Sequence, residues 1–316
     1  MSLSGAGPAA ALLSSLFSKE TGVNFMRVKW YVPYLFVLPA FLLIVVVLYN
    51  PIVQNMYTSL FSTAAFSSQP RFVGLQNYAS FFSDANLLTA FRNNIYYGAT
   101  CIVFQCGLGL VLAIIMESKL IRNHSGFFRT VYFIPSVISI TAAALLWKFI
   151  YQSRGGLLNT VLATLGLEQF QHAWLGEANL AIWAIILMAQ WQYMGYYCML
   201  LIVSIQKIPE DMYESASIDG ANGFQKAIYI TIPAIREMIL VVTVIDVIGC
   251  LKVFTEVYVM TLGGPGYASH TVGTLLYQYA FIYNKMGYAA AIGTVMFVIM
   301  LLLSMLQLRI SGSGKQ

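Results

Sequence analysis

Three ionisable side chains, Asp246, Lys252 and Glu256, interrupt one long apolar run of the sequence. If this run crosses a membrane, each charge costs about 2.5–3.5 kcal/mol, so such groups usually face a cavity or one another. Lys252 and Glu256 have the spacing at which helical side chains pair, but near the end of the run both can also reach water. Asp246 has no such route. We expect it to face the interior, against either a substrate or a neighbouring helix.

A second apolar run carries Gln190-Trp191-Gln192-Tyr193, and a third carries Gln105. Amides bind the hydroxyl groups of a sugar and aromatic rings cover its C–H face. The same amides also join neighbouring membrane helices. Both interpretations stay open for each residue, and Lys252, together with Lys148, leaves room for an acidic sugar.

The composition places these residues in a membrane protein. Of 316 residues 59% are hydrophobic, 9% are charged, and the mean hydropathy is +0.74, whereas about a quarter of the residues of a soluble domain are charged. The net charge of +5 does not indicate a nucleic-acid partner, because most of the basic residues lie in the segments that flank the apolar runs. The four cysteines lie in apolar runs without metal-ligand or redox spacing, so we expect packing roles and no metal site.

Six apolar runs approach the roughly 20 residues that a helix needs to cross the hydrocarbon core. The sequence therefore predicts an all-α polytopic membrane protein with six transmembrane helices. These are Tyr31–Tyr49, Ile95–Met116, Thr130–Trp147, Leu180–Gln206, Met238–Tyr258 and Gly287–Leu308. A seventh uncharged run, Thr271–Asn284, is too short to span, and its three tyrosines suit a membrane interface.

The basic residues fix the orientation of these helices. Eleven lie on one side: Lys19, Arg27, Lys29, Lys119, Arg122, Arg129, Lys207, Lys226, Arg236, Arg309 and Lys315. Four lie on the other: Arg71, Arg92, Arg154 and Lys285. Because basic loops stay cytoplasmic, both termini are predicted to be cytoplasmic. The chain then has an N-terminal tail (1–30), a membrane domain (31–310) with a cytoplasmic loop at 207–233, and a C-terminal tail (311–316).

Residues within the loop at 207–233 indicate where short helices begin and end. Pro209 suits the first turn of a helix, and the acidic Glu210 and Asp211 suit its positive end. Asp219-Gly220 ends that helix, since glycine accepts a left-handed turn. A second amphipathic segment follows and ends at Pro233. The sequence predicts two short helices joined by a turn at the cytoplasmic surface.

The loop reads Glu214-Ser215-Ala216, three residues, Gly220, nine residues, then Ile230-x-Ile232-Pro233. It resembles the EAA signature of permease subunits of binding-protein-dependent ABC importers, which reads E-A-A, three residues, G, nine residues, I-x-L-P. Ser215 and Ile232 depart from the usual alanine and leucine, and both changes are small.

The resemblance extends over residues 30 to 310 and is to the carbohydrate group of these permeases, in particular the maltose-type first permease. The segments similar to that group are Asp219-Gly220-Ala221, Arg71 to Tyr78 (F-x-G-L-x-N-Y), Phe128-Arg129 leading to Ile134-Pro135, and Thr261-x-Gly263-Gly264-Pro265.

The resemblance implies a type I ABC importer permease fold in the cytoplasmic membrane of a bacterium or archaeon. It implies a heterodimer with a second permease, two ATPase subunits that hold ATP and Mg²⁺, and an extracytoplasmic solute-binding protein that delivers a carbohydrate. Carried over by position, the contact with the ATPase falls on Glu214, Ser215, Ala216 and Gly220. The residues that set its geometry are Asp219, Ala221 and Pro233.

The chain has no site of its own for ATP. A phosphate-binding loop ends in Gly-Lys-Ser/Thr, and the nearest match, Gly312-Ser313-Gly314-Lys315, lacks the upstream glycine and the final hydroxyl. We therefore expect a transport subunit with no catalytic residues and no bound cofactor. An ion-coupled secondary transporter that uses Asp246 is the alternative, but it predicts inverted repeats, and none is visible. An intramembrane enzyme would need paired His or Asp residues within spans, whereas the three histidines lie in loops.

Overall fold

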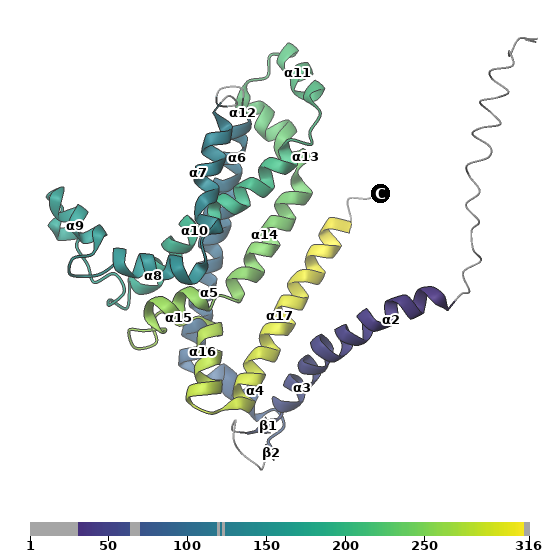
Figure 1. Ribbon diagram of the computed structural model, residues 1–316, viewed down its shortest axis with the longest axis vertical. Helices are drawn as coiled ribbons and strands as arrows, with labels where there is room; N and C mark the ends of the chain where they lie inside the picture. The colour runs from purple at the N-terminus through teal and green to yellow at the C-terminus, as the bar shows by residue number, and fades with distance from the viewer. Residues whose placement is uncertain (1–30, 64–69, 119–120, 122–123, 313–316) are drawn as a thin grey trace, which may run out of the picture. The chain divides into compact units, whose positions relative to one another are not determined.

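The computed structural model describes residues 31–63, 70–118, 121 and 124–312. The predicted tails 1–30 and 313–316 lie outside these ranges. The described chain is helical apart from a two-stranded antiparallel ribbon, β1 (Phe61–Ser62) with β2 (Arg71–Phe72) (Figure 1). It divides into two units, residues 1–54 and 55–316, which we describe separately.

The first unit contains α2 (Val32–Ile44), the π-helical segment η1 (Val45–Tyr49) and the first turn of α3 (Asn50–Thr58). Nearly every described side chain from Tyr34 to Tyr49 is exposed and apolar, as expected for a helix that faces lipid. The predicted helix at Tyr31–Tyr49 is confirmed, and the candidate span extends to Thr58.

The second unit contains the remaining helices. Their bounds are α4 (Gln76–Ser83), α5 (Ala85–Cys101), η2 (Ile102–Leu108), α6 (Gly109–Glu117), α7 (Ser125–Val137), α8 (Ile140–Ile150), α9 (Leu157–Thr164), η3 (Glu168–Phe170), α10 (Ala181–Ile205), α11 (Glu210–Ile218), α12 (Gly223–Lys226), η4 (Ala227–Thr231), α13 (Ile232–Ala234), α14 (Arg236–Leu251), α15 (Thr255–Thr261), α16 (Val272–Tyr277), η5 (Gln278–Ile282) and α17 (Met286–Gly312).

Four described helices are long and apolar enough to cross a membrane, and two bent helix pairs bring the number to six if each pair crosses once. The four are Tyr34–Thr58, Ala85–Glu117, Ala181–Ile205 and Met286–Ile310. The segment predicted to be too short to span forms the helix Val272–Ile282. The six predicted runs therefore correspond to the six candidate crossings, although two of them are broken.

Helix α10 lies at the centre of the second unit and packs against α6, α7, η2, α14 and α15 (Figure 1). It has no charged residue, and its buried side chains lie on all sides of the helix, as expected for a helix surrounded by others. Small residues permit close approach, and at Gly195 the backbone of α10 meets the Tyr132 carbonyl of α7.

The second span begins ten residues before its predicted start at Ile95. Asp84 caps α5 by accepting hydrogen bonds from the backbone N–H groups of Asn86 (3.0 Å) and Leu87 (3.2 Å). Its other carboxylate oxygen accepts from the hydroxyl groups of Tyr279 and Tyr288. The hydropathy pattern missed this first part because it contains polar residues, of which Asn93 and Asn94 are turned inward.

The third predicted span, Thr130–Trp147, is wrong as a single helix. It breaks at Ile138-Ser139 into α7 and α8, which are bent by 95°. Pro135 weakens the helix there because it lacks an N–H group and its ring clashes with an earlier carbonyl. The Gln192 side chain donates to the carbonyls of Pro135 (2.9 Å) and Ile138 (2.8 Å), so α10 satisfies backbone groups that the break releases.

The fifth predicted span, Met238–Tyr258, is also broken. Helix α14 ends at Leu251 and α15 starts at Thr255, bent by 41°. Asn94 of α5 supports the break, since its Nδ2 donates to the Cys250 carbonyl (2.7 Å) and its Oδ1 accepts from the Val272 N–H (2.8 Å). The Thr271 hydroxyl donates to the Val253 carbonyl at 2.7 Å.

The close contact at Gly195 gives a test of this packing. A Cβ added there would lie 1.8 Å from the Tyr132 carbonyl oxygen, so Gly195→Ala forces α7 and α10 apart, and overpacking of this kind costs about 1–3 kcal/mol. We expect a lower unfolding temperature for the purified protein in detergent. Gly126→Ala on α7 is the matched control, because its Cβ would meet nothing within 4 Å. Equal unfolding temperatures for the two variants would contradict the packing.

Candidate functional site

A cavity of about 330 Å³ lies where α5, η2, α10 and the break between α14 and α15 meet. Five of the residues predicted to line a substrate path are in its wall: Gln105, Tyr193, Asp246, Lys252 and Glu256. The predicted residues Gln190, Trp191 and Gln192 are not. The structure therefore brings together polar groups from three separate spans.

The cavity wall also contains residues that sequence reasoning missed, above all Tyr97, Tyr197 and the cysteines. They belong to stripes with a spacing of four residues, which places side chains on one face of a helix. The stripes are Tyr97, Cys101 and Gln105 on α5–η2, Tyr193 and Tyr197 on α10, and Asp246 and Cys250 on α14. This spacing is visible in the sequence, but which stripes share a cavity depends on how the helices pack.

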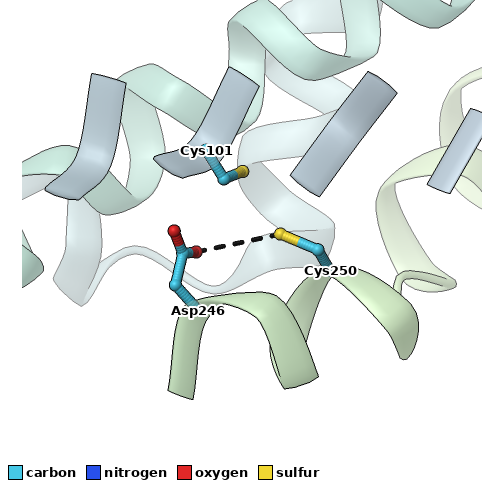
Figure 2. Close-up of side chains that lie close together, drawn as sticks. All are labelled: Cys101, Asp246 and Cys250. Carbon is cyan, nitrogen blue, oxygen red and sulfur yellow. Dashed lines mark hydrogen bonds between the residues drawn. The ribbon is translucent and has the colours of Figure 1, made fainter. Parts of the chain in front are cut away.

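Asp246 is 3% exposed, so the expectation that it faces the interior is confirmed. One carboxylate oxygen accepts from the Cys106 thiol at 3.5 Å and the other from the Cys250 thiol at 3.8 Å. Figure 2 shows Asp246 and Cys250 on α14, with Cys101 opposite on α5. Asp246 thus contacts neighbouring helices and also borders the cavity.

Of the two alternatives left open for Lys252 and Glu256, the pair does not form among the described residues. Glu256 is buried and accepts a hydrogen bond from the Tyr97 hydroxyl at 2.7 Å. Lys252 is exposed. The reason is the helix break at residues 252–254, because the spacing of four pairs side chains only within a continuous helix. Of these two residues in the cavity wall, only the lysine is therefore exposed.

The Gln190-Trp191-Gln192 segment makes helix contacts. Gln190 Nε2 donates to the Cys101 sulfur (3.4 Å) and to the Ile186 carbonyl (3.2 Å). Trp191 is half-buried, with its ring centroid 5.6 Å from that of Trp147. Gln192 supports the break between α7 and α8, as described above. This geometry corresponds to the packing interpretation of the segment.

The loop at 207–233 forms the predicted pair of short helices. Glu210 and Asp211 occupy the first turn of α11, and Gly220 follows it with a φ of +79°. Asn222 and Gln225 form a capping box that starts α12. Two hydrogen bonds hold the helices together, one from Lys226 Nζ to the Ser217 hydroxyl (2.6 Å) and one between the hydroxyl groups of Tyr213 and Thr231 (2.9 Å).

The signature residues lie on the outer surface of this helix pair. Glu214, Ser215, Asp219, Gly220 and Pro233 are exposed, while Ala216 and Ala221 are half-buried. Sequence reasoning missed a set of exposed apolar side chains beside them, which consists of Ile218 (87% exposed), Phe224 (75%) and Tyr229 (76%). Apolar side chains this exposed beside polar ones are typical of a protein-binding surface.

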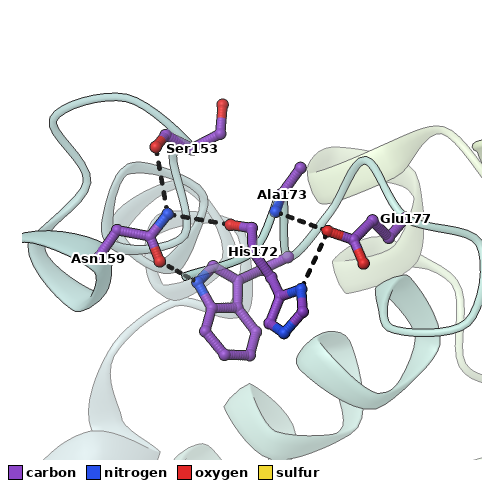
Figure 3. Close-up of polar contacts among 6 residues, drawn as sticks. Ser153, Asn159, His172, Ala173 and Glu177 are labelled. Atoms are coloured by element: carbon purple, nitrogen blue, oxygen red, sulfur yellow. Dashed lines mark hydrogen bonds and ion pairs between the residues drawn. The ribbon is translucent and has the colours of Figure 1, made fainter. Parts of the chain in front are cut away.

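The opposite side of the unit carries an ordered loop built around Asn159 (Figure 3). Its Nδ2 donates to the carbonyls of Ser153 (3.1 Å) and His172 (2.9 Å), and its Oδ1 accepts from the Trp174 indole N–H (2.8 Å). Glu177 accepts from the Ala173 N–H at 3.0 Å. No sequence signal distinguishes Asn159 from an ordinary loop asparagine, so this centre was missed.

The Thr261–Pro265 segment forms the second loop on this side. Gly263 has a φ of +87°, and a Cβ there would overlap the ring of His270. Asn93 of α5 holds the loop through the carbonyls of Ala268 (2.7 Å) and His270 (2.8 Å). Burial lowers the pKa of His270 to about 4, so its ring is neutral at physiological pH.

Comparisons with known proteins identify the family to which the chain belongs. Residues 105–313 match the family described as "Binding-protein-dependent transport system inner membrane component". The chain is 46% identical over 285 residues to the probable ABC transporter permease protein YurN of Bacillus subtilis, covering 90% of this chain and 97% of the relative. It is 32% identical over 285 residues to the arabinooligosaccharides transport system permease protein AraP of the same species, covering 90% and 89%.

A solved structure shares the fold. A chain in the crystal structure of a bacterial ABC transporter involved in the import of the acidic polysaccharide alginate superposes with a TM-score of 0.78 at 21% identity. The match covers 90% of this chain and 96% of that one. The two broken helices therefore belong to a fold that is also known from a crystal structure.

The Tyr97–Glu256 contact gives a prediction for the cavity wall. Tyr97→Phe removes the hydroxyl donor to a buried carboxyl group, a loss that costs about 1–3 kcal/mol. We expect a lower unfolding temperature and a non-zero coupling energy between positions 97 and 256 in a double-mutant cycle with Glu256→Gln. Tyr96→Phe, one residue away and 37% exposed, should behave as wild type. A cycle with zero coupling would rule out the contact.

Proposed function

Because the chain belongs to the family of binding-protein-dependent transport system inner membrane components, we propose that it is the permease subunit of an ATP-driven importer for a carbohydrate, specifically an oligosaccharide. Family membership makes it a multi-pass inner-membrane transport subunit and not an enzyme. It also argues against an ion-coupled transporter driven through Asp246. The substrate, the subunit composition and the residue roles below are our proposals.

The observation that carries the carbohydrate assignment is the mixed lining of the cavity. Gln105 offers an amide, Tyr193 and Tyr197 offer hydroxyl groups and ring faces, and Glu256 offers a carboxyl group. Sugars are recognised by hydrogen bonds to their hydroxyl groups and by apolar contact with their C–H faces. That the similar AraP serves arabinooligosaccharides supports the same class of substrate here.

The charges in the wall favour a neutral sugar. Two carboxyl groups, Asp246 and Glu256, border the cavity against one ammonium group, Lys252. Wherever these carboxyl groups are ionised they repel an anionic sugar, and in a site partly excluded from water like charges repel more strongly than in bulk water. We therefore propose a neutral oligosaccharide, although the sequence left an acidic one open.

The cytoplasmic helix pair is the proposed contact with the ATPase. Glu214, Ser215 and Gly220 lie exposed on it next to Ile218 and Phe224, a combination of polar and apolar groups suited to a partner cleft. The two hydrogen bonds between the helices let the pair move as one body. Two partner ATPase subunits would hold ATP and Mg²⁺, and their closure would push this pair and turn the bundle from inward- to outward-facing.

The outer loops are the proposed contact with the solute-binding protein. Asn159 of α9 fixes the segment between α8 and α10, and apolar side chains on α9 and directly after it are exposed, among them Leu157 (60%) and Leu165 (66%). A second permease would complete the translocation path beside the cavity. Loaded binding protein and ATP must favour the same outward-facing state, since a ligand shifts an equilibrium only through differential affinity.

Reconstitution tests the function directly. The chain is placed in proteoliposomes with its partner permease and ATPase subunits, and each binding protein encoded with them is loaded with neutral or acidic oligosaccharides. We expect a loaded binding protein to stimulate ATP hydrolysis several-fold and to permit uptake of a neutral oligosaccharide. An ATPase variant that cannot hydrolyse ATP should abolish uptake. Uphill uptake without any ATPase subunit would refute the assignment.

The turn at Gly220 tests the coupling role. A leucine there would have to adopt the left-handed conformation, at a cost of about 1–2 kcal/mol, and would change the angle between the two helices. Gly220→Leu should insert normally but lose ATPase co-purification or the binding-protein stimulation of hydrolysis. Gly223→Ala, whose Cβ meets nothing within 4 Å, is the control and should transport normally. Normal transport by Gly220→Leu would remove the coupling role.

A further inference from the structure

Three potential metal ligands converge in the wall of the cavity described above. The sulfur atoms of Cys101 and Cys250 and a carboxylate oxygen of Asp246 all lie within 4.8 Å of one another. All three residues are at least 96% buried, and both thiols are free. Figure 2 shows the side chains meeting between α5 and α14. The sequence predicted no metal site because these residues come from different spans.

The surroundings of Cys101 support a thiolate. Its sulfur accepts hydrogen bonds from two side-chain amides, Gln105 Nε2 at 3.2 Å and Gln190 Nε2 at 3.4 Å. Donors that point at sulfur stabilise its anionic form and fix its orientation, as the outer partners of metal ligands do. Gln190 also joins α10 to α5 in this way, and the acceptor that both amides share is the sulfur of one of the three potential ligands.

We propose that Cys101, Asp246 and Cys250 form a binding site for a thiophilic divalent cation of the Zn²⁺ class. The two thiolates and the carboxylate are three ligands, and a water molecule from the cavity supplies the fourth. Thiolate sulfur selects Zn²⁺ and similar soft ions over Mg²⁺ and Ca²⁺, which prefer oxygen. The bound ion ties α5 to α14.

The geometry and charge of the cluster fit such an ion. Tetrahedral Zn²⁺ with sulfur bonds of about 2.3 Å needs ligand atoms about 3.8 Å apart. Side-chain rotations that move the ligand atoms by about 1 Å therefore complete the site. Binding releases the two thiol protons to solvent through the cavity, and the divalent ion replaces them. The net charge of the buried cluster therefore stays the same, which avoids the cost of adding a buried charge. The cavity bordered by all three residues gives the ion access.

Cadmium titration tests the site on the full-length chain purified with its partner subunits. Cd²⁺ bound by thiolates gives an ultraviolet charge-transfer band, and we expect it to saturate at one ion per chain and to disappear when Zn²⁺ competes. Mg²⁺ should leave it unchanged. Cys101→Ser and Cys250→Ser should weaken Cd²⁺ binding at least about tenfold, the size of loss that even an outer partner produces.

The chain offers a matched control. Cys198 is also a buried free cysteine, on α10 and outside this ligand group, so Cys198→Ser should keep the band and the affinity. Gln105→Leu should keep the band but weaken binding about tenfold, because it removes one donor to the Cys101 sulfur. The Zn²⁺ competition on wild type needs no variant to fold. Absence of a band in wild type, or a band unchanged in Cys101→Ser and Cys250→Ser, would overturn the proposal.

Discussion

The requirement that backbone hydrogen-bonding groups find partners away from water governs this structure. A straight helix meets the requirement by itself, but two of the six candidate spans are broken. At each break a side-chain amide from another helix replaces the lost partner, Gln192 for the bend after α7 and Asn94 for the bend after α14. The polar residues of the apolar runs thus serve first to make irregular backbone possible at membrane depth.

The breaks explain where the cavity lies. Residues 252–254 interrupt the helix and leave room between α5, α10 and α14, and Asp246, Cys250 and Glu256 flank this interruption. Irregular backbone within membrane helices is tolerated where it borders a cavity or is covered by protein, and here both conditions hold. The interruption of the helix therefore accounts for both the position of the polar groups and the shape of the cavity.

Much of the fold was accessible from the sequence because it depends on local patterns. Hydropathy identified all six crossings, and Pro209, Gly220 and the acidic first turn identified the cytoplasmic helix pair. The breaks were missed because hydropathy responds to composition and not to backbone continuity. The Lys252–Glu256 pair stayed open as an alternative for the same reason, since it assumes an unbroken helix.

The candidate site was only partly accessible for a different reason. Asp246 stood out as a charge within a span, but Tyr97, Cys101 and Cys250 become significant only when α5 and α14 lie together. Asn93 and Asn94 look like loop residues in the sequence, and their polarity hid the first part of the second span. Their role is to accept and donate across helices, which depends on tertiary packing and leaves no periodic signal.

The π-helical segment η2 divides the second span into halves that serve different neighbours. On its N-terminal side α5 packs mainly against α14, and on its C-terminal side α6 packs against α10. A wide turn of this kind contains one residue more than a regular turn, and one residue rotates a helix by about 100°. Deleting a single residue within Ile102–Leu108 would thus leave the hydrophobicity of the span unchanged while swinging Ala113 and Met116 off the face of α10. The length of this segment, more than its composition, decides which helices the span can join.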